Sequence, residues 1–425
     1  MGKKNFIIFI LLIALICSGC GRQEEKEWGQ FNPVPVKKRE ALTVLTNKNM
    51  RTDNWECPTK DGCYSAKYAV DANKGCNLFF TDYKAQKRVY LSSSVNGDYW
   101  NENDTSYLKS ANAVSLCQDG NYLYAYAYEM LEDDSFQYVM YKMELDGQNR
   151  KELFRTGEMS EISGGIVCDS EYLYFLNTEI RDGREIDYIC AADKNDGGDI
   201  HKIYGFEANG DWHFLTSAFD RKVVIKTIVT DEDIEKQEHK ILLFDIDTGK
   251  ITEAMSWKQG EIEEIYNNEY VYYADIKSGC IVSKNISDGT EQILWSDIPL
   301  AEKTATDISL NAQLYDDDIF LIVGGKRYAL NVKTKEIKAL TLMEEGNNEE
   351  QKYITVLGSS EDAFYVVAGK GQRRVAIKNP QEGMPNEEII DYDKYAMIKK
   401  EDFYNNRPNY IMIEDMEIDK DSIVS

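Results

Sequence analysis

The sequence is poor in histidine, in proline and in positive charge. Its 425 residues include only three histidines and seven prolines. We expect His201 and His239 at the surface, beside a turn and in a charged loop. Because histidine is the side chain that most often transfers protons near neutral pH, this scarcity argues against histidine-based catalysis.

Signature motifs of common enzymes and metal sites are absent as well. We find no Gly-x-Ser-x-Gly elbow, no His-Glu-x-x-His pattern and no phosphate-binding loop. Residues 193–199 begin like a calcium loop, but Tyr204 stands at the twelfth position, where such a loop needs a bidentate carboxylate. We therefore predict no catalytic residue, no metal ligand and no cofactor.

Positive charge is outnumbered by negative charge. The chain has 49 Lys and Arg residues against 74 Asp and Glu residues, which gives a formal net charge of −25. A polyanionic chain repels phosphate backbones, so we predict no nucleic-acid partner. A solvated, soluble surface explains this charge, and attraction of a cationic partner is the alternative.

Long apolar runs are absent after the first 20 residues, and that first segment has the features of a targeting signal. Two lysines precede an apolar run at residues 6–16, and Ser18 and Gly19 stand before Cys20. The run is too short to span a bilayer comfortably. Small residues before a cysteine resemble a bacterial lipobox, which implies that Cys20 is acylated. An ordinary secretory signal cleaved nearby is the alternative.

These features divide the chain into three regions. We predict a lipoprotein signal peptide at residues 1–19, the lipidated cysteine and a flexible tether at residues 20–41, and a folded domain at residues 42–425. The expected location is the cell membrane, with the protein held by its lipid and facing the outside of the cell.

A repeat dominates the rest of the sequence. Apolar and aromatic runs with strand periodicity recur every 44 to 50 residues, most of them after a polar turn, and we expect them to be inner strands of a repeated sheet. The runs start at Asn77, Tyr122, Tyr172, Lys222, Tyr270, Ile319 and Ala363. A unit of four short strands at this spacing is typical of a β-propeller blade.

We predict an all-β chain that forms a single β-propeller of four-stranded antiparallel blades. The count is seven, and six or eight blades fit the same class of fold. Each blade buries its faces against two neighbours, so the ring must close. We expect residues 395–398, 410–413 or 42–45 to complete a blade that both chain ends share.

Seven cysteines remain besides Cys17 and Cys20, an odd number that cannot all pair within one chain. Cys57 and Cys63 flank a turn-rich loop that could close as a small disulfide outside the cytoplasm or keep two free thiols. The cysteines in strand-like runs and before turns are explained by core packing.

Three neighbouring residues fall outside the repeat. Asp211, Trp212 and His213 lie where one blade connects to the next, and such connections run over the surface and often carry function. We predict a recognition loop there. By contrast, Trp257 and Trp295 follow the turn glycines of their repeats at similar distances, so we expect them in the core.

The repeat motifs resemble those of a known group of proteins. Tyr122-Leu123-Tyr124 after a turn, Leu145-Asp146-Gly147 before a short strand, and the lipobox are similar to surface lipoproteins of clostridium-type Gram-positive bacteria. These carry propeller domains similar to the TolB-like and lipoprotein-receptor-like propellers, of uncharacterised function. Relatives often follow their opening blade with a cysteine-rich segment, whereas residues 92–94 are serines here, so no metal or disulfide role is carried over.

These observations favour a binding or scaffold module for an envelope protein or glycan. The alternative is a propeller-fold enzyme that acts on extracellular glycans as a lyase or hydrolase, with carboxylates of the central channel as acid and base. Two carboxylates beside an aromatic platform at the channel mouth would favour the enzyme. An apolar or featureless mouth would favour binding.

Overall fold

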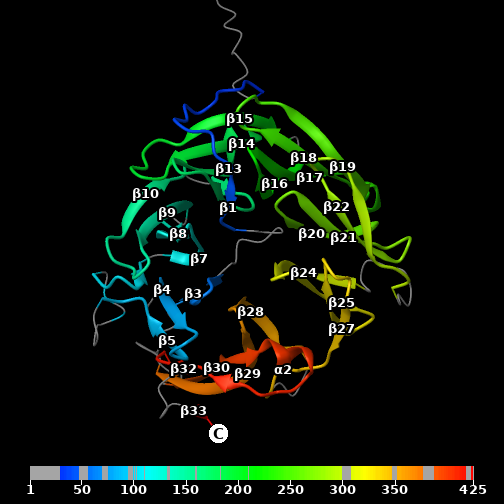
Figure 1. Ribbon diagram of the computed structural model, residues 1–425. Coiled ribbons are helices and arrows are strands. Elements are labelled where there is room, and N and C mark those ends of the chain that lie inside the picture. The colour runs from blue at the N-terminus through cyan, green and yellow to red at the C-terminus, as the bar shows by residue number, and fades with distance from the viewer. Residues whose placement is uncertain are drawn as a thin grey trace, which may run out of the picture.

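The computed structural model describes residues 29–46, 56–68, 75–93, 99, 101, 103–109, 111–131, 135–157, 160–181, 183–208, 210–298, 308–346, 352–376, 387–417 and 423–424. Seven sheets stand in a ring around a central axis, so the chain is a seven-bladed β-propeller (Figure 1). The predicted all-β class, the four-stranded antiparallel blades and the count of seven are confirmed. The targeting segment and Cys20 lie outside the described residues.

The blades follow one another in chain order. Blade 1 contains β2 (Glu56–Pro58), β3 (Gly62–Tyr68), β4 (Cys76–Asp82) and β5 (Lys87–Tyr90). Blade 2 contains β7 (Ala111–Gln118), β8 (Tyr122–Met130), β9 (Phe136–Glu144) and β10 (Lys151–Arg155). Blade 3 contains β12 (Val167–Cys168), β13 (Tyr172–Arg181), β14 (Arg184–Asp193) and β15 (His201–Glu207). Blade 4 contains β16 (Trp212–Phe219), β17 (Lys222–Val229), β18 (Glu238–Asp245) and β19 (Ile251–Lys258).

The last three blades have the same order of strands. Blade 5 contains β20 (Ile262–Asn267), β21 (Tyr270–Asp275), β22 (Cys280–Asn285) and β23 (Glu291–Trp295). Blade 6 contains β24 (Ile308–Tyr315), β25 (Asp318–Val323), β26 (Lys326–Asn331) and β27 (Ile337–Leu340). Blade 7 contains β28 (Thr355–Ser359), β29 (Ala363–Ala376), β30 (Glu387–Lys399) and β31 (Ile411–Met412). The other elements are β1 (Thr43–Val44), β6 (Tyr107–Leu108), β11 (Glu161–Ile162), η1 (Ile234–Lys236), α2 (Lys400–Tyr404), β32 (Glu414–Asp415) and β33 (Ile423–Val424).

The repeated motif lies on the second strand of a blade and not on the innermost one. In blades 2 to 7 it falls on β8, β13, β17, β21, β25 and β29, and only in blade 1 does it fall on the third strand, β4. Each of these strands has a partner on both edges, so the expectation of inner strands is confirmed, although they are not the strands nearest the axis. A second strand has a partner on each edge and a neighbouring blade on each face, which favours burial along the strand; six successive residues of β17 are buried.

Neighbouring blades are held together by buried apolar side chains, and each of the seven junctions has its own cluster. Between blades 2 and 3, Phe154 stacks on Phe175 with ring centroids 5.0 Å apart. Between blades 7 and 1, Tyr83 packs on Tyr365 at 5.5 Å. Aromatic residues supply large buried areas at each contact. The ring is therefore closed by packing at every junction.

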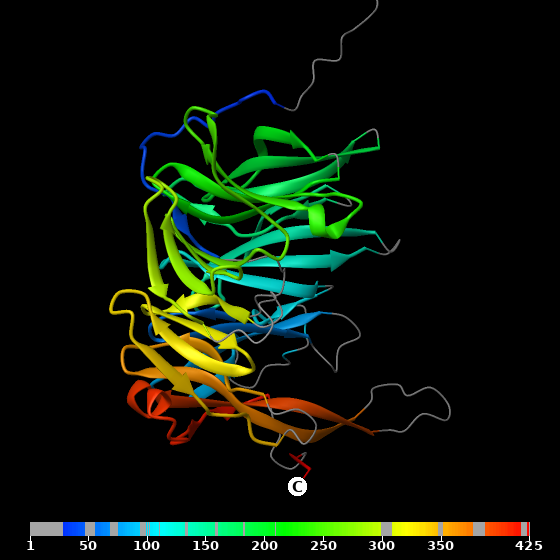
Figure 2. The same ribbon diagram turned by 90° about the vertical axis from the view of Figure 1, so that its right-hand side faces the viewer.

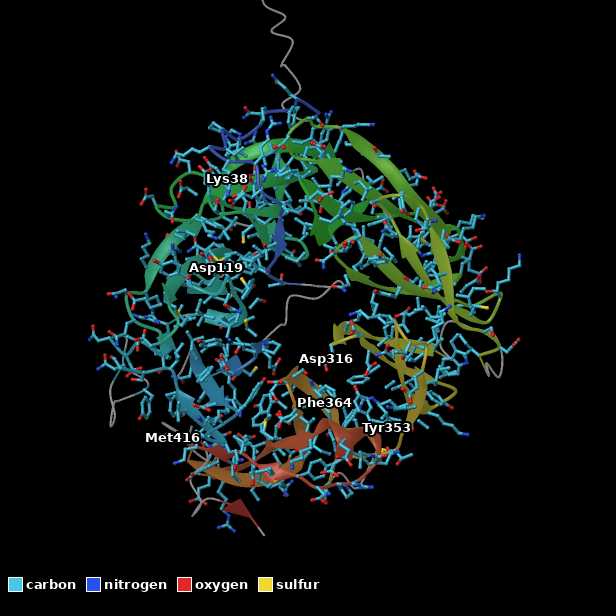
Figure 3. All side chains as sticks on the ribbon, in the orientation of Figure 1. Lys38, Asp119, Asp316, Tyr353, Phe364 and Met416 are labelled. Atoms are coloured by element: carbon cyan, nitrogen blue, oxygen red, sulfur yellow. The ribbon has the colours of Figure 1, made fainter. Side chains whose placement is uncertain are left out.

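The polar turns that precede the motif also connect blades. Asp119 lies in the turn between β7 and β8 and accepts hydrogen bonds from the Tyr124 hydroxyl at 3.0 Å and from Lys194 of the next blade at 2.9 Å (Figure 3). Asp169, at the same place in blade 3, is bonded in the same way by Tyr174 at 2.8 Å and by Arg221 of blade 4 at 2.9 Å. The recurring turn carboxylate is thus an inter-blade ion-pair partner.

Residues 29–46 pack on the ring. The N–H of Gly29 donates to the carbonyl of Gly205 beside the outer edge of blade 3, and Phe31 contacts Phe244 of blade 4. Further along, β1 pairs with β12 at the inner edge of blade 3. The described part of the predicted tether, residues 29–41, is therefore bound to blades 3 and 4. The expectation that residues 42–45 help to close the ring is wrong.

The C-terminal segment joins blade 7 to blade 1. β31 is the fourth strand of blade 7, and β32 continues from it to pair in parallel with β5 of blade 1. Arg88, which is 1 % exposed, bonds Asp415 and Glu417, each at 2.9 Å. The two ends do not share a four-stranded blade as expected, because blade 7 is built entirely from C-terminal strands. Instead, β32 extends the sheet of blade 1.

The ring has two unlike faces. Because strands alternate in direction, the connections from one blade to the next and the turns between second and third strands lie on one face, which we call the connection face. Figure 2 shows β29 and β30 projecting on this side, while residues 29–46 run over the opposite side. Any ligand contact made by blade-to-blade connections therefore lies on the connection face.

Candidate functional site at the junction of blades 3 and 4

The predicted recognition loop lies on the connection face, between β15 and β16. Asp211 belongs to the connection itself: its N–H donates to the carbonyl of Ala208, and its carboxylate accepts from the Thr230 N–H at 3.0 Å. Trp212 and His213, however, are the first residues of β16. Only Asp211 is therefore a loop residue, and the two aromatic residues stand on a strand.

The alternation of a strand separates Trp212 from His213. Successive side chains point to opposite faces of a sheet. Trp212 is 54 % exposed, whereas His213 is 7 % exposed and packs toward blade 3. The three predicted residues are adjacent, but they do not form one exposed surface. Trp212 can contact a large ligand directly, and His213 is held in the protein.

His213 forms a buried pair with Asp187 of β14. Its Nδ1 lies 2.7 Å from Oδ2 of Asp187, whose side chain is 4 % exposed. The other carboxylate oxygen of Asp187 accepts from the Thr178 hydroxyl at 2.5 Å. An ionised carboxylate can only accept, so Nδ1 carries the proton and Nε2 is left for another partner when the ring is neutral.

Further contacts fix the ring of His213. Phe206 of β15 stacks on the imidazole with ring centroids 4.9 Å apart. Thr178 lies 3.3 Å from the Ser163 hydroxyl, which extends the chain of hydrogen bonds away from Asp187. Nearby, partial burial raises the pKa of Glu161, with smaller contributions from Glu185 and Asp187. An imidazole held in one orientation by a carboxylate is a feature shared by structural pairs and by catalytic dyads.

A second group of ionisable side chains lies between blades 4 and 5. Lys226 of β17 pairs with Glu264 of β20, and burial raises the pKa of Glu264. Burial and the charge of Glu264 also raise the pKa of Glu263. Adjacent residues of a strand point to opposite faces, so these two carboxylates do not converge on one substrate position. They therefore do not form the pair of carboxylates beside an aromatic platform that would favour an enzyme.

The tryptophan beside Lys226 is a core residue, as expected. Trp257 is 7 % exposed and stacks on His239 at 5.4 Å. His239 itself is 7 % exposed, so its expected surface position is wrong. It lies on β18 opposite Trp257, and its place in a strand, rather than in the charged loop before it, accounts for the difference. Neither ring offers a stacking platform.

No family model matches the chain. No curated protein matches it either. Among solved structures, it is similar to puromycin hydrolase, with 9 % identity, a TM-score of 0.46, and coverage of 87 % of this chain and 54 % of that one. An acylaminoacyl peptidase of Pyrococcus horikoshii gives 10 % identity, a TM-score of 0.46, and coverage of 80 % and 57 %.

A third solved structure comes from an analysis of two prolyl endopeptidases, with 9 % identity, a TM-score of 0.49, and coverage of 88 % of this chain and 49 % of that one. The chain spans about half the length of the first solved structures that it matches. Likenesses this distant carry no argument about function. The propeller assignment rests on the strand pairing described above.

Cys57 and Cys63 lie on opposite sides of blade 1. Cys57 faces Tyr64 across the β2–β3 ladder and packs in the cluster shared with blade 2, whereas Cys63 packs in the cluster shared with blade 7. Both thiols are free, and burial raises the pKa of Cys57 to about 12. A bond between them stays a prediction, and this geometry does not favour it.

Within the residues that the structure describes, no group of three or more His, Cys, Asp or Glu side chains is arranged to hold a metal ion.

Sequence reasoning missed Asp187, although a carboxylate within the apolar run of β14 is a usable sign of a buried polar partner. Its partner could not be read from the sequence, because 26 residues separate Asp187 from His213.

The described residues also contain no helix with the length and apolar character needed to cross a membrane.

Proposed function

We propose that this protein is a lipid-anchored, extracytoplasmic propeller that binds an envelope glycan through its connection face. The observation that carries the proposal is Trp212, which is 54 % exposed on the first strand of blade 4. An exposed indole offers a flat apolar surface and one N–H donor, which together suit the apolar face and the hydroxyl groups of a sugar ring. β16 lies in a four-stranded sheet, so this surface is presented rigidly.

The surroundings of Trp212 support ligand binding by contact. Asp211 is fixed by the Thr230 N–H, and Thr230 in turn donates from its hydroxyl to the carbonyl of Gly210 at 3.0 Å. These bonds order the connection in advance, which reduces the entropy that binding must overcome. The tests below can instead show that the ligand is a protein that buries Trp212.

The lipid anchor is the part of the proposal that concerns location. Cys20→Ala removes the thiol that would be acylated, so we expect the variant to leave the membrane fraction and appear in the soluble fraction. The measurement is fractionation of cells that express each protein, followed by detection in membrane and soluble fractions. Cys280→Ala, which changes a partly exposed thiol of blade 5, is the control and should stay with the membrane. Retention of the Cys20 variant would contradict the anchor.

The glycan contact is tested by Trp212→Ala. We expect affinity for cell-wall glycan fragments to fall at least about tenfold, because removal of a central exposed tryptophan commonly costs 1–2 kcal/mol or more. The measurement is calorimetric titration of the soluble domain with fragments of defined composition. Ile293→Ala removes a side chain that is 55 % exposed on β23 and should leave affinity unchanged. Equal affinity of both variants, or binding of an envelope protein alone, would reject the glycan.

The pair formed by Asp187 and His213 favours a second candidate, an enzyme that acts on the same glycan. A buried carboxylate that orients an imidazole is the arrangement of a general base. The same titrations decide between the two, since an enzyme would shorten the fragments over time and His213→Gln would abolish that shortening. Glycan fragments that stay intact during the titration support a protein that binds the glycan without cleaving it.

A further inference from the structure

A cleft of about 400 Å³ lies between blades 6 and 7, away from Trp212. Strands β24, β25 and β26 form one wall, and β28 with residues 352–354 of the connection before it forms the other. Tyr353, labelled in Figure 3, lies in that connection and donates from its hydroxyl to the carbonyl of Gly325 at 3.0 Å. A volume of this size is within the range of small-molecule sites.

The lining of this cleft includes one buried cation, Arg327, which is 8 % exposed. Its Nη1 donates to the carbonyl of Ile354, and its guanidinium lies 5.2 Å from the ring centroid of Phe320. Among the described residues, no carboxylate lies within 4.0 Å of its nitrogens. A guanidinium has five N–H donors, so one carbonyl leaves most of them without a protein acceptor.

Other buried cations of this protein have negative neighbours. Arg88 contacts Asp415 and Glu417, and Lys226 contacts Glu264. The pKa of Lys142 is lowered mainly by burial, but Asp119 and Asp193 oppose that effect. Burial lowers the pKa of Arg327 to about 10, and only Tyr315 and Tyr353 act against it. An almost fully buried charge without a counter-charge is rare in proteins, because the cost of removing it from water is not offset.

The remaining charges near the cleft offset one another. Lys352 lies at its edge with its Nζ 3.6 Å from Oε1 of Glu344, and the Thr355 hydroxyl donates to the same oxygen at 3.1 Å. Glu344 is enclosed behind Thr355, and its other oxygen has no hydrogen-bond partner. The net charge that faces the cleft is therefore the charge of Arg327.

The rest of the lining is largely apolar. Phe320, Ile354 and Val356 are buried in the cluster that blades 6 and 7 share, and they contribute to its walls. Few polar groups in an apolar cleft are typical of a site that fixes a ligand by one charged end and encloses the other. We propose that this cleft binds a carboxylate that carries an apolar group, with the carboxylate paired to Arg327 and the apolar group against Phe320.

The geometry accounts for both halves of such a ligand. A carboxylate can accept two parallel hydrogen bonds from a guanidinium, and this pairing is strongest where water is excluded. It would supply the counter-charge that Arg327 does not receive from the residues that the structure describes. Two kinds of molecule carry a carboxylate next to an apolar group. One is a peptide whose last residue is apolar, and the other is a free aliphatic acid.

The test is calorimetric titration of the full domain with two matched pairs of probes. N-acetyl-leucine and N-acetyl-leucinamide stand for the peptide terminus, and octanoate and octanamide stand for the aliphatic acid. We expect at least one acid to bind saturably and its amide to bind at least about tenfold more weakly. Binding of N-acetyl-leucine alone identifies the peptide source, and binding of octanoate alone identifies the aliphatic source.

Variants of Arg327 connect any binding to the cleft. Arg327→Met should weaken binding of the acid at least about tenfold. Arg327→Lys should weaken binding less, because lysine keeps the positive charge but lacks the two parallel N–H donors of the guanidinium. Arg407→Met, which changes an arginine that is 59 % exposed on blade 7, should bind as the wild type does. If Arg327→Met does not fold, Arg327→Lys alone decides. The proposal is overturned if acids bind no tighter than amides, or if every folded Arg327 variant binds like the wild type.

Discussion

Two arginine side chains show how much the surroundings of one residue matter. Arg88 and Arg327 are 1 % and 8 % exposed. Burial alone would lower both pKa values, but Asp415, Tyr395 and Glu417 raise the pKa of Arg88 above its ordinary value. Within the described part of the chain, no carboxylate does this for Arg327. The first charge is stabilised in the folded state and the second is not.

Replacement by methionine should therefore have opposite effects at the two positions. Arg88→Met leaves Asp415 and Glu417 buried without their partner, so we expect the free energy of unfolding to fall by roughly 3–5 kcal/mol. Arg327→Met removes an unpaired charge at the loss of one hydrogen bond, so we expect a rise of about 1–2 kcal/mol. Urea denaturation followed by tryptophan fluorescence measures both. Equal destabilisation by the two substitutions would contradict this account.

At the scale of single residues, the sequence predicted the burial of an apolar side chain better than that of polar side chains. The place of Trp257 in its repeat predicted a core residue, and the structure confirms it. For His239 and His213, neighbouring residues in the sequence suggested exposure, but strand alternation directs both rings inward. Whether a polar side chain is buried depends on the side chain that faces it, and that side chain comes from another strand.

At the scale of elements, the turn between first and second strands connects blade 2 to blade 3 and blade 3 to blade 4. Asp119 accepts from Lys194 at 2.9 Å, from the Tyr124 hydroxyl at 3.0 Å, and from the backbone N–H groups of Asn121 and Tyr122. Burial would raise its pKa, but Lys194 and the two N–H groups lower it below the ordinary value. The turn residue thus stabilises both its own hairpin and the junction of blades 2 and 3.

Asp119→Ala should destabilise the protein by roughly 3 kcal/mol, since it leaves Lys194 buried without a carboxylate. The control is Asp146→Ala, which changes an exposed turn carboxylate that accepts from the N–H of Gln148 at 3.0 Å, and which should cost under about 1 kcal/mol. Thermal unfolding by calorimetry gives both values. A similar loss from the two substitutions would show that Asp119 acts only within its hairpin.

The repeat period located every blade, but it did not identify which strand carries the motif. A strand whose residues alternate between apolar and polar can be recognised from its local sequence alone. The position of a strand within its sheet depends on short partners such as β12, which has two residues and leaves almost no periodic signal. The strands nearest the axis were therefore not recognised from the sequence.

At the scale of the whole molecule, stability depends on the closure between blades 7 and 1. Seven apolar clusters join the blades, and the one at this junction is accompanied by a group of buried charges. Glu417 accepts from Arg88 and Lys67, at 2.9 and 3.0 Å, and from Arg373 at 2.9 Å. Burial would raise the pKa of Glu417, but Arg88 and Lys67 lower it below its ordinary value. Closure is thus partly electrostatic.

Removal of residues 413–425 keeps all four strands of blade 7 and deletes β32 with Glu417. We expect a single unfolding transition at a temperature several degrees lower, because each blade depends on both neighbours. Calorimetry of both proteins at pH 7 measures the shift. An unchanged midpoint would show that the ring does not need this closure.

Acid should weaken the same closure. The folded-state pKa of Glu417 is lowered, so its contribution to stability is present above the unfolded value near 4.5 and is lost as pH falls through the folded value. Below pH 4.5, Glu417→Gln should therefore lose less stability than the wild type. Glu414→Gln, which changes a carboxylate that is 51 % exposed and paired with Lys87, should retain the wild-type acid dependence.

The sequence by itself determined the class of fold and the number of blades, because strand periodicity and turn residues are local and recur at each unit. It also marked Asp211, Trp212 and His213 as an interruption of that repeat. Only the tertiary structure decided what closes the ring, which side chain orients His213, and that no carboxylate of the described residues pairs with Arg327. Each of those facts depends on strands that are distant in the chain and adjacent in space, and no local pattern records which of many similar strands will meet.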